Sequence, residues 1–292
     1  MQNLFLVTII AILIIVLVIA IILFSMRTVA PTSTVKTTLA NTTTVPPTST
    51  FTTIPPMNIS EAAGFNTTSK TISYMSSAIS SDFNNTFSIS FWMYPKRIGN
   101  GINGSRYSEQ IFQLSGSGGF PQVVTSWSGA GNLSVVVCSN SKECLMSLIP
   151  FNYTNKWIFI AETLNSNNTL GIYINGKLYN NTFIPLLFNS ASKKMWVSNS
   201  TSLLLSSVFP FSSNNFNVGY DGLLSDVQIY NISLSSSQIE QLYSTGVGTS
   251  LPIFTDLVAW YPLNGNLDDY SGHLYNAIAY SNVSFVPLGN LT

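Results

Sequence analysis

Alternating apolar and polar positions between residues 157 and 182 predict three consecutive β-strands. Two strands, 157–164 and 170–174, are joined by a polar Asn/Ser loop, and a third strand, 177–184, follows the dipeptide Asn175-Gly176. Asn-Gly favours a type I′ hairpin turn, because both central residues of that turn need positive φ. Apolar side chains recur on both faces of the first two strands, as in strands buried on one face or both. The region is therefore predicted to be a β-meander.

Similar short β-patterns, separated by Gly, Asn, Ser and Pro, continue through most of the chain after residue 70. The predicted strands are 71–80, 87–95, 109–115, 120–127, 132–138, 144–149, 216–219 and 223–230, with a loosely patterned region at 183–209. One helix is predicted after Ser235, which forms an N-cap with Gln238 as its capping-box partner, and Gly246 ends this helix. The pattern predicts an all-β fold, a two-sheet antiparallel sandwich.

An apolar run within residues 1–27 is long enough to cross a membrane. The run from Leu4 to Phe24 has one polar interruption, Thr8, and as a helix it would span about 31 Å, which matches a bilayer core. The alternative is a cleaved signal peptide, but its apolar region is normally shorter and follows a positive charge. We expect a single-pass membrane anchor with the C-terminal domain extracellular, although Arg27 and Lys36 oppose this orientation under the positive-inside rule.

Residues 28–56 have the composition of a linker. The 29 residues include 12 Thr, 2 Ser and 5 Pro and carry one charge, at Lys36. Such a segment cannot bury enough apolar area to fold, and its prolines keep it extended. An O-glycosylated stalk and a plain disordered spacer both fit this composition. In either case, the linker is expected to hold the following domain away from the membrane.

The charge content excludes one class of partner and agrees with export from the cell. Charged residues make up 8% of the chain and the net charge is zero, so nucleic acid is not an expected partner. Thirteen Asn-x-Ser/Thr sequons support an exported glycoprotein, although a chain rich in Asn, Ser and Thr also produces sequons by chance. The candidate glycosylation sites are Asn103, Asn132, Asn152, Asn167, Asn180 and Asn231.

Cys138 and Cys144 lie on opposing predicted strands, where a disulfide is favoured over two free thiols and indicates an oxidising compartment.

Three segments, in order, resemble signatures of the LamG-like, concanavalin A-like jelly-roll domains. They are the strand FSISFWMYP at 87–95, the meander ending in Tyr-x-Asn-Gly, and the closing segment 216–246 with Gly222, Asp226 and Tyr230-Asn231. The resemblance covers about residues 62–246 and implies a jelly-roll recognition domain at 57–250. Asp226 is expected to bond backbone groups at a strand edge.

The C-terminal segment 251–292 contains a motif in an unexpected place. Residues 257–280 resemble the opening motif of the same family, yet they follow its closing motif. The segment either begins a truncated second domain or supplies a permuted strand to the first sandwich. About 40 residues cannot build a sandwich, and the first and last strands of such jelly rolls are neighbours. We favour the permuted strand, which predicts that 257–262 pairs within the sandwich.

The acidic residues do not form a catalytic pattern. The wider superfamily includes glycoside hydrolases, which need two carboxylates facing across a cleft, and the strand motif Glu-x-Asp-x-x-Glu is absent here. The single histidine, His273, has no evident partner, so we expect no enzymatic activity. LamG-like domains often hold calcium on rim loops, and Asn266, Asp268 and Asp269 offer suitable oxygen atoms. The alternative is an Asx-turn loop that satisfies its own backbone.

Aromatic side chains are the remaining candidates for ligand contacts. Trp127, Trp196 and Trp260 are the candidates for exposed rings, whereas Trp92 and Trp157 lie in strand patterns typical of the core. The sequence favours a membrane-tethered, non-catalytic recognition or adhesion module that binds glycans or cell-surface proteins. The alternatives are a structural cell-envelope component without a discrete ligand and, more remotely, a glycoside hydrolase.

Overall fold

The computed structural model describes residues 56–66, 73–80, 83, 86–96, 108–116, 121–128, 131–138, 144–183, 201–206 and 218–290. They belong to one compact unit, Ile54–Thr292. The predicted anchor, 1–27, and the linker up to residue 55 lie outside the described residues. Within the described ranges, no helix is long and apolar enough to span a membrane.

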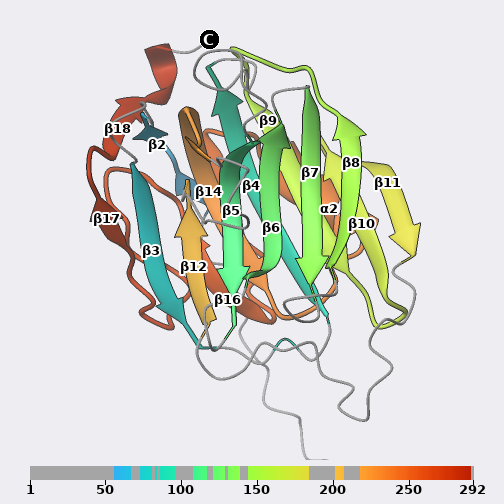
Figure 1. The fold of residues 1–292 in the computed structure, drawn as a ribbon. Helices are drawn as coiled ribbons and strands as arrows, with labels where there is room; N and C mark the ends of the chain where they lie inside the picture. Colours follow the sequence, from blue (N-terminus) through green and yellow to red (C-terminus); the bar gives the residue numbers. More distant parts are fainter. Residues whose placement is uncertain are drawn as a thin grey trace, which may run out of the picture. The chain divides into compact units, whose positions relative to one another are not determined.

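Two eight-stranded sheets form a sandwich, and we call them the front and back sheets as they appear in Figure 1. The front sheet has the strand order β17-β3-β12-β5-β6-β7-β8, with β13 pairing in parallel with β5 and all other pairs antiparallel. Its strands are β3 (Tyr74–Ile79), β5 (Ser108–Ser115), β6 (Pro121–Ser128), β7 (Asn132–Cys138), β8 (Cys144–Pro150), β12 (Thr201–Leu205), β13 (Val218–Gly219) and β17 (Ile278–Tyr280).

The back sheet is entirely antiparallel and has the order β11-β10-β9-β4-β14-β2-β18. Its strands are β2 (Glu61–Phe65), β4 (Phe87–Pro95), β9 (Ile158–Leu164), β10 (Thr169–Ile174), β11 (Lys177–Phe183), β14 (Gly222–Tyr230), β16 (Leu257–Tyr261) and β18 (Ser284–Pro287). A further short pair joins β1 (Met57–Asn58) to β15 (Thr249–Ser250), and a 3-10 turn, η1 (Leu288–Asn290), follows β18. The predicted all-β antiparallel sandwich is confirmed.

The predicted meander is formed by β9, β10 and β11. Asn175 and Gly176 have φ values of 50° and 76°, as a type I′ turn requires, and Ile174 pairs with Lys177 across the turn. The Asn175 side chain also accepts a hydrogen bond of 3.0 Å from the Phe159 backbone nitrogen. The turn is thereby fixed to β9 as well as to the hairpin it closes.

The predicted helix is α2 (Ser236–Ser244), the only α-helix among the described residues. Ser235 is its N-cap and forms both hydrogen bonds of a capping box with Gln238, as predicted. The buried side chains of Ile239 and Leu242 pack it against the back sheet. Local sequence signals therefore defined this element correctly.

The buried side chains form two cores. The larger core fills the space between the sheets, and the smaller one lies where α2 packs on the back sheet. Trp92 belongs to the smaller core and is 6% exposed, while the half-buried Trp157 packs against it. Both tryptophans thus have the structural role that the strand pattern predicted.

The C-terminal segment contributes β16, which pairs with β14, and an edge strand to each sheet. β16 pairs antiparallel with β14, with Val227 opposite Tyr261, beside the stretch of β14 that pairs with β2. β17 pairs with β3 in the front sheet, and β18 pairs with β2 in the back sheet. The segment that resembles an opening motif therefore lies within the sandwich, although it comes last in the chain.

Candidate ligand-binding site

Two of the three tryptophans that were candidates for ligand contacts, Trp127 and Trp260, are buried. Trp127 is 0% exposed; its indole nitrogen donates to the Phe151 carbonyl at 3.2 Å and its ring meets the Phe151 ring edge-on. Trp260 is 4% exposed, and its indole nitrogen donates to Asp226 Oδ1 at 2.8 Å. Neither ring can serve as the exposed ligand contact for which it was a candidate, because each apolar body completes a core. Trp196 lies outside the described residues.

Two of the three candidate calcium ligands, Asp269 and Asn266, use side-chain oxygen atoms internally. Asp269 is buried, and its carboxylate accepts hydrogen bonds from the backbone nitrogens of Trp260, Ser271 and Tyr275 at 2.9, 2.9 and 3.0 Å. Asn266 Oδ1 accepts from the Asp268 backbone nitrogen at 3.1 Å. Within the described ranges, no group of three or more His, Cys, Asp or Glu side chains could hold a metal ion. The contacts correspond to the alternative interpretation, an Asx-turn loop that satisfies its own backbone.

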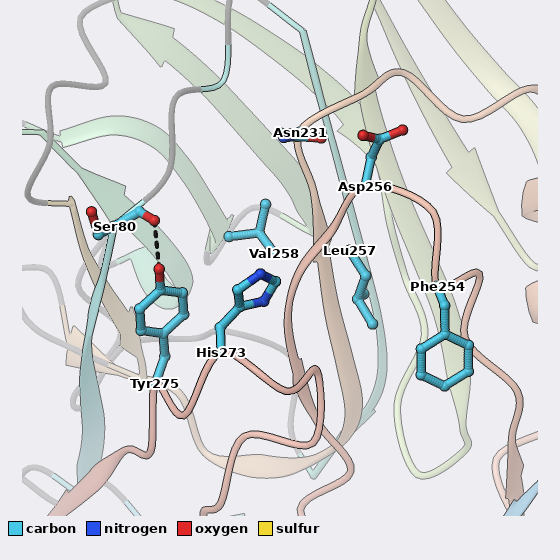
Figure 2. Close-up of a pocket in the computed structure, with 8 residues that line it drawn as sticks. All are labelled: Ser80, Asn231, Phe254, Asp256, Leu257, Val258, His273 and Tyr275. Carbon is cyan, nitrogen blue, oxygen red and sulfur yellow. Dashed lines mark hydrogen bonds between the residues drawn. The ribbon is translucent and has the colours of Figure 1, made fainter. Parts of the chain in front are cut away.

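The same loop positions one wall of an open pocket of about 330 Å³ at one end of the sandwich (Figure 2). The pocket lies where β3 and β14 end and β16 begins. Its lining residues are Ser80, Asn231, Phe254, Asp256, Leu257, Val258, His273 and Tyr275. Sites for small molecules in proteins usually have volumes of about 300–1,000 Å³, so this pocket is large enough for a small molecule.

Hydrogen bonds hold the aromatic wall of the pocket in place. The rings of His273 and Tyr275 stack with centroids 5.6 Å apart and planes 10° from parallel. The Tyr275 hydroxyl donates to the Ser80 carbonyl at 2.6 Å, which is drawn in Figure 2, and His273 Nδ1 lies 3.1 Å from Ser271 Oγ. Asp269 fixes the backbone of Tyr275 from behind. The loop that carries the candidate calcium ligands thus forms the aromatic wall of this pocket.

The polar wall is formed by Asn231 and Asp256. The Asn231 backbone nitrogen donates to the Asp256 carbonyl at 3.1 Å, and Thr86 Oγ1 donates to the Asn231 carbonyl at 2.8 Å, so the two residues are held together. Asp256 is exposed and has a φ of 58°, in a turn just before β16. Asn231 Oδ1 is buried without a hydrogen-bond partner. The described part of the lining includes no lysine or arginine.

Phe254 supplies a third aromatic group to the pocket. It is 41% exposed, and its ring meets Trp260 edge-on at 6.1 Å. Trp260 therefore contacts a lining residue of the pocket without lining it itself. An exposed ring beside carboxamide and carboxylate groups is a suitable surface for the apolar face and the hydroxyl groups of a sugar.

Two buried carboxyl groups lie away from this pocket. We expected Asp226 to bond backbone groups at a strand edge. Its carboxylate instead accepts hydrogen bonds from the side chains of Gln228, Ser250 and Trp260. Burial raises the pKa of Asp226, and these hydrogen bonds oppose the rise. The expectation was wrong because a β-bulge in β14, where Asp226 has a φ of 51°, turns its carboxylate inward. Glu162 faces the inter-sheet core, where burial raises its pKa to about 7 despite a hydrogen bond from Thr125.

The predicted covalent link between Cys138 and Cys144 is present. The two residues pair across β7 and β8 and form a disulfide with a Cα–Cα distance of 4.0 Å. Of the candidate glycosylation sites, Asn152 and Asn167 are exposed, whereas Asn132, Asn180 and Asn231 are half-buried; Asn103 lies outside the described residues.

Comparison with known proteins agrees with this fold. The family model Laminin_G_3, of the concanavalin A-like lectin/glucanases superfamily, matches residues 69–240. The chain belongs to this superfamily. A comparison of the sequence with curated proteins found no match.

Two proteins of known structure have a sandwich similar to that of this chain. A candidate carbohydrate-binding protein from Bacteroides ovatus ATCC 8483 has a TM-score of 0.53 and 15% identity; the match covers 80% of this chain and 61% of that one. The native heptameric SAP-like pentraxin from Limulus polyphemus has a TM-score of 0.55 and 14% identity over 80% of this chain and 97% of that one. At these identities, the similarity shows the shared fold alone.

The sequence did not mark most of the residues that line this pocket as candidate ligand contacts. His273 was expected to be inert and Asn231 to be a sequon residue, and Phe254 and Asp256 were not singled out as ligand contacts. The pocket residues come from four separated parts of the chain, so no spacing pattern links them. The one local signal is an aromatic residue two positions before an acidic one, Phe254 and Asp256, ahead of a strand.

Proposed function

We propose that this protein is a non-catalytic recognition module that binds glycans in the pocket formed by Phe254, Asp256, Asn231, His273 and Tyr275. The observation that carries the proposal is the pocket itself, in which exposed aromatic rings lie beside polar side chains at the end of a jelly-roll sandwich. The carbohydrate-binding description of the similar Bacteroides ovatus structure agrees with it. The rest of the sandwich would hold the loops that carry these residues in place.

The arrangement of acidic groups supports binding over hydrolysis. A glycoside hydrolase uses two carboxyl groups about 5–10 Å apart on either side of the scissile bond. In the described lining of the pocket, Asp256 is the one carboxylate. Glu162 has a pKa suited to a general acid, but it is fully buried between the sheets and cannot contact a sugar.

We further propose that residues 1–27 tether the module to a membrane and that residues 28–56 extend it outward on the extracellular side. The apolar run from Leu4 to Phe24 and the Thr/Pro-rich composition that follows support this arrangement. The disulfide agrees with an oxidising compartment. Extraction of membranes at alkaline pH tests the tether: the full-length chain should stay with the lipid, and release into the supernatant would contradict it.

A glycan array with the full-length chain tests the binding function. We expect saturable binding to one class of sugar, and Phe254→Ala should weaken it about fivefold, because an exposed aromatic face contributes about 1 kcal/mol. Tyr179→Ala is the matched control, since Tyr179 is 52% exposed on β11 and does not line the pocket. Binding that survives Phe254→Ala and His273→Ala would place the ligand elsewhere. Self-assembly without sugar binding would favour the structural alternative.

A further inference from the structure

We infer that this protein binds an extended, uncharged glycan chain across two neighbouring pockets: the pocket already described and a second pocket beside α2 on the back sheet. The inference rests on the proposed function and specifies the class of glycan, an internal stretch of a neutral chain in place of a single terminal sugar. Its basis is the lining of the second pocket and the contact that joins the two pockets.

The second pocket has a volume of about 560 Å³ and lies where β9, β10 and β11 face the segment 232–236 that leads into α2. Its floor includes Thr163, Tyr173 and Leu178. These side chains close over Gly171, where a Cβ would lie 2.9 Å from Thr163 Oγ1. The Tyr173 hydroxyl lies 3.1 Å from Ser236 Oγ and so joins the floor to the wall that α2 supplies. The volume is in the usual range for small-molecule sites, about 300–1,000 Å³.

The walls of the second pocket carry hydroxyl and amide groups, and its described lining includes no charged side chain. Ser166 and Asn181 are exposed, and Thr169 and Ser233 are half-buried. The side chains of these four residues make no hydrogen bond with the residues that the structure describes. Hydroxyl and amide groups both donate and accept hydrogen bonds, as sugar hydroxyls do. They can therefore exchange water for an uncharged sugar, whereas a charged ligand would lack a counter-charge.

Apolar surface completes the second pocket. Leu178 is 48% exposed and lies opposite Tyr173 in the pairing of β10 with β11. The apolar face of a sugar ring can pack on Leu178 while its hydroxyl groups bond to the walls. Sites for small molecules combine apolar surface with a few polar groups in this way, so the second pocket has the composition of a site for a neutral sugar.

One hydrogen bond joins the two pockets. Thr86 Oγ1 donates to the Asn231 carbonyl at 2.8 Å; Thr86 lines the second pocket, and Asn231 lines the first. The residue after Asn231, Ile232, also lines the second pocket, so residues 231 and 232 form a wall that both pockets share. A chain that leaves the first pocket over this wall enters the second.

The spacing of the strands sets the length of the ligand. β10, β9, β4 and β14 lie side by side in the back sheet, and β16 pairs with β14 (Figure 1). The four steps from β10 to β16 through this order, at about 4.8 Å each, amount to about 19 Å. A disaccharide is too short to contact both pockets, and a hexasaccharide is long enough. In the described linings of the two pockets, Asp256 is the one carboxylate and lysine and arginine are absent, which disfavours an acidic chain.

The test compares short and long members of three neutral series, the cello-, chito- and manno-oligosaccharides, with a galacturonate hexasaccharide as the acidic comparison. Binding of each disaccharide and hexasaccharide to the full-length chain is measured by calorimetry. The host should form disulfides without attaching N-glycans, because Asn167, in the loop between β9 and β10 that lines the second pocket, is a sequon residue. In the series that binds, we expect the hexasaccharide to bind about tenfold more tightly than the disaccharide, the effect of one or two additional net hydrogen bonds. The galacturonate hexasaccharide should bind most weakly.

Asn181→Met is the decisive variant. Asn181 lies opposite Gly171 in the pairing of β10 with β11, so a longer apolar side chain at 181 would lie over the floor of the second pocket. The variant should lower the affinity for the hexasaccharide about tenfold, to that of the disaccharide, and leave the affinity for the disaccharide unchanged. Ser166→Met, on another wall of this pocket, should act in the same direction. Asn152→Met is the matched control, at an exposed asparagine outside both linings, and should change neither affinity.

The two proposals fail in different ways. Phe254→Ala, in the first pocket, should weaken binding of both lengths by the same factor. Equal affinities for the two lengths in the wild type, or a length effect that survives both Asn181→Met and Ser166→Met, would overturn the inference and leave the glycan-binding proposal intact. Tighter binding of the galacturonate hexasaccharide than of every neutral chain would also overturn the inference. Absence of binding to every glycan, in these series and on the array, would overturn both.

Discussion

Glu162 provides a test of how a buried ionisable group controls the stability of this sandwich. It is 0% exposed on β9 and faces the inter-sheet core. Thr125 Oγ1 donates to one carboxyl oxygen at 2.5 Å, and the other carboxyl oxygen is buried without a hydrogen-bond partner. Burial penalises the charged form, and this is the main cause of the rise of its pKa from 4.5 to about 7.

The direction and size of the pH effect on stability follow from the difference between the pKa of Glu162 in the folded chain and its ordinary value. Below pH 4.5, Glu162 is protonated in both the folded and the unfolded chain. Between pH 4.5 and about 7, the unfolded chain releases this proton and the folded chain keeps it, so the free energy of unfolding falls as the pH rises. One pKa unit corresponds to about 1.4 kcal/mol, so the total loss is about 3 kcal/mol and is complete above pH 7.

Glu162→Gln removes this titration while keeping the size of the side chain. Urea unfolding with the disulfide intact, followed by tryptophan fluorescence between pH 4 and 8, gives the free energy of unfolding of both proteins. We expect the variant to gain about 3 kcal/mol relative to the wild type between the acid and neutral ends of this range. The comparison uses the change with pH, because a buried amide nitrogen without an acceptor adds a cost that does not depend on pH. Glu240→Gln, on the exposed face of α2, is the matched control and should change little.

A constant difference between the wild type and Glu162→Gln across this pH range would refute the reasoning. It would mean that Glu162 ionises at its ordinary pKa in the folded protein, through water that reaches the inter-sheet core. A difference of the opposite sign would mean that the charged carboxylate stabilises the fold.

Three further substitutions test the local structure by urea unfolding. Asp226→Asn should lower the free energy of unfolding by about 1–3 kcal/mol, because the amide nitrogen cannot accept the hydrogen bonds that a carboxylate oxygen accepts in its place. Asparagine tolerates the φ of 51°, so the backbone should not change, and an unchanged urea midpoint would contradict this reasoning. Gly176→Ala should lower the free energy of unfolding more than Gly246→Ala, because both glycines have positive φ but only a Cβ at 176 would lie close to another group, 2.7 Å from a ring atom of Tyr243 in α2. Equal losses of stability would show that only the backbone φ matters. Replacing Cys138 and Cys144 together by serine should cost about 2 kcal/mol, the chain-entropy estimate for the short loop they close, and a loss near zero would count against that account.

Local sequence signals determined the elements whose geometry depends on near neighbours. Asn175-Gly176 specified its turn because few residues adopt positive φ twice in succession, and the capping box of Ser235 and Gln238 specified the start of α2. Strong alternation placed the strands at 87–95 and 132–138, which are β4 and β7. These features, together with the family signatures, were enough to define the sandwich.

Elements stabilised by distant partners were missed. β2, with the sequence EAAGF, lacks β-branched residues, and it is a strand because β14 and β18 pair with its two edges. A Cβ at Gly64 would lie 2.8 Å from Ser284 Oγ, so its glycine permits the approach of a strand more than 200 residues away in the sequence. β12 likewise lay in a region without a clear pattern.

The candidate site depended on tertiary structure most of all. The sequence by itself determined a β-sandwich with a disulfide hairpin, and it gave the loop around Asp269 as a place to look for function. Only the folded chain decided that Trp127 and Trp260 are buried, that Asp269 supports a loop instead of presenting a ligand oxygen, and that Asn231 and Asp256 are adjacent. The physical reason is that exposure and contacts between residues far apart in sequence depend on how the two sheets and the C-terminal segment pack, which no local pattern records.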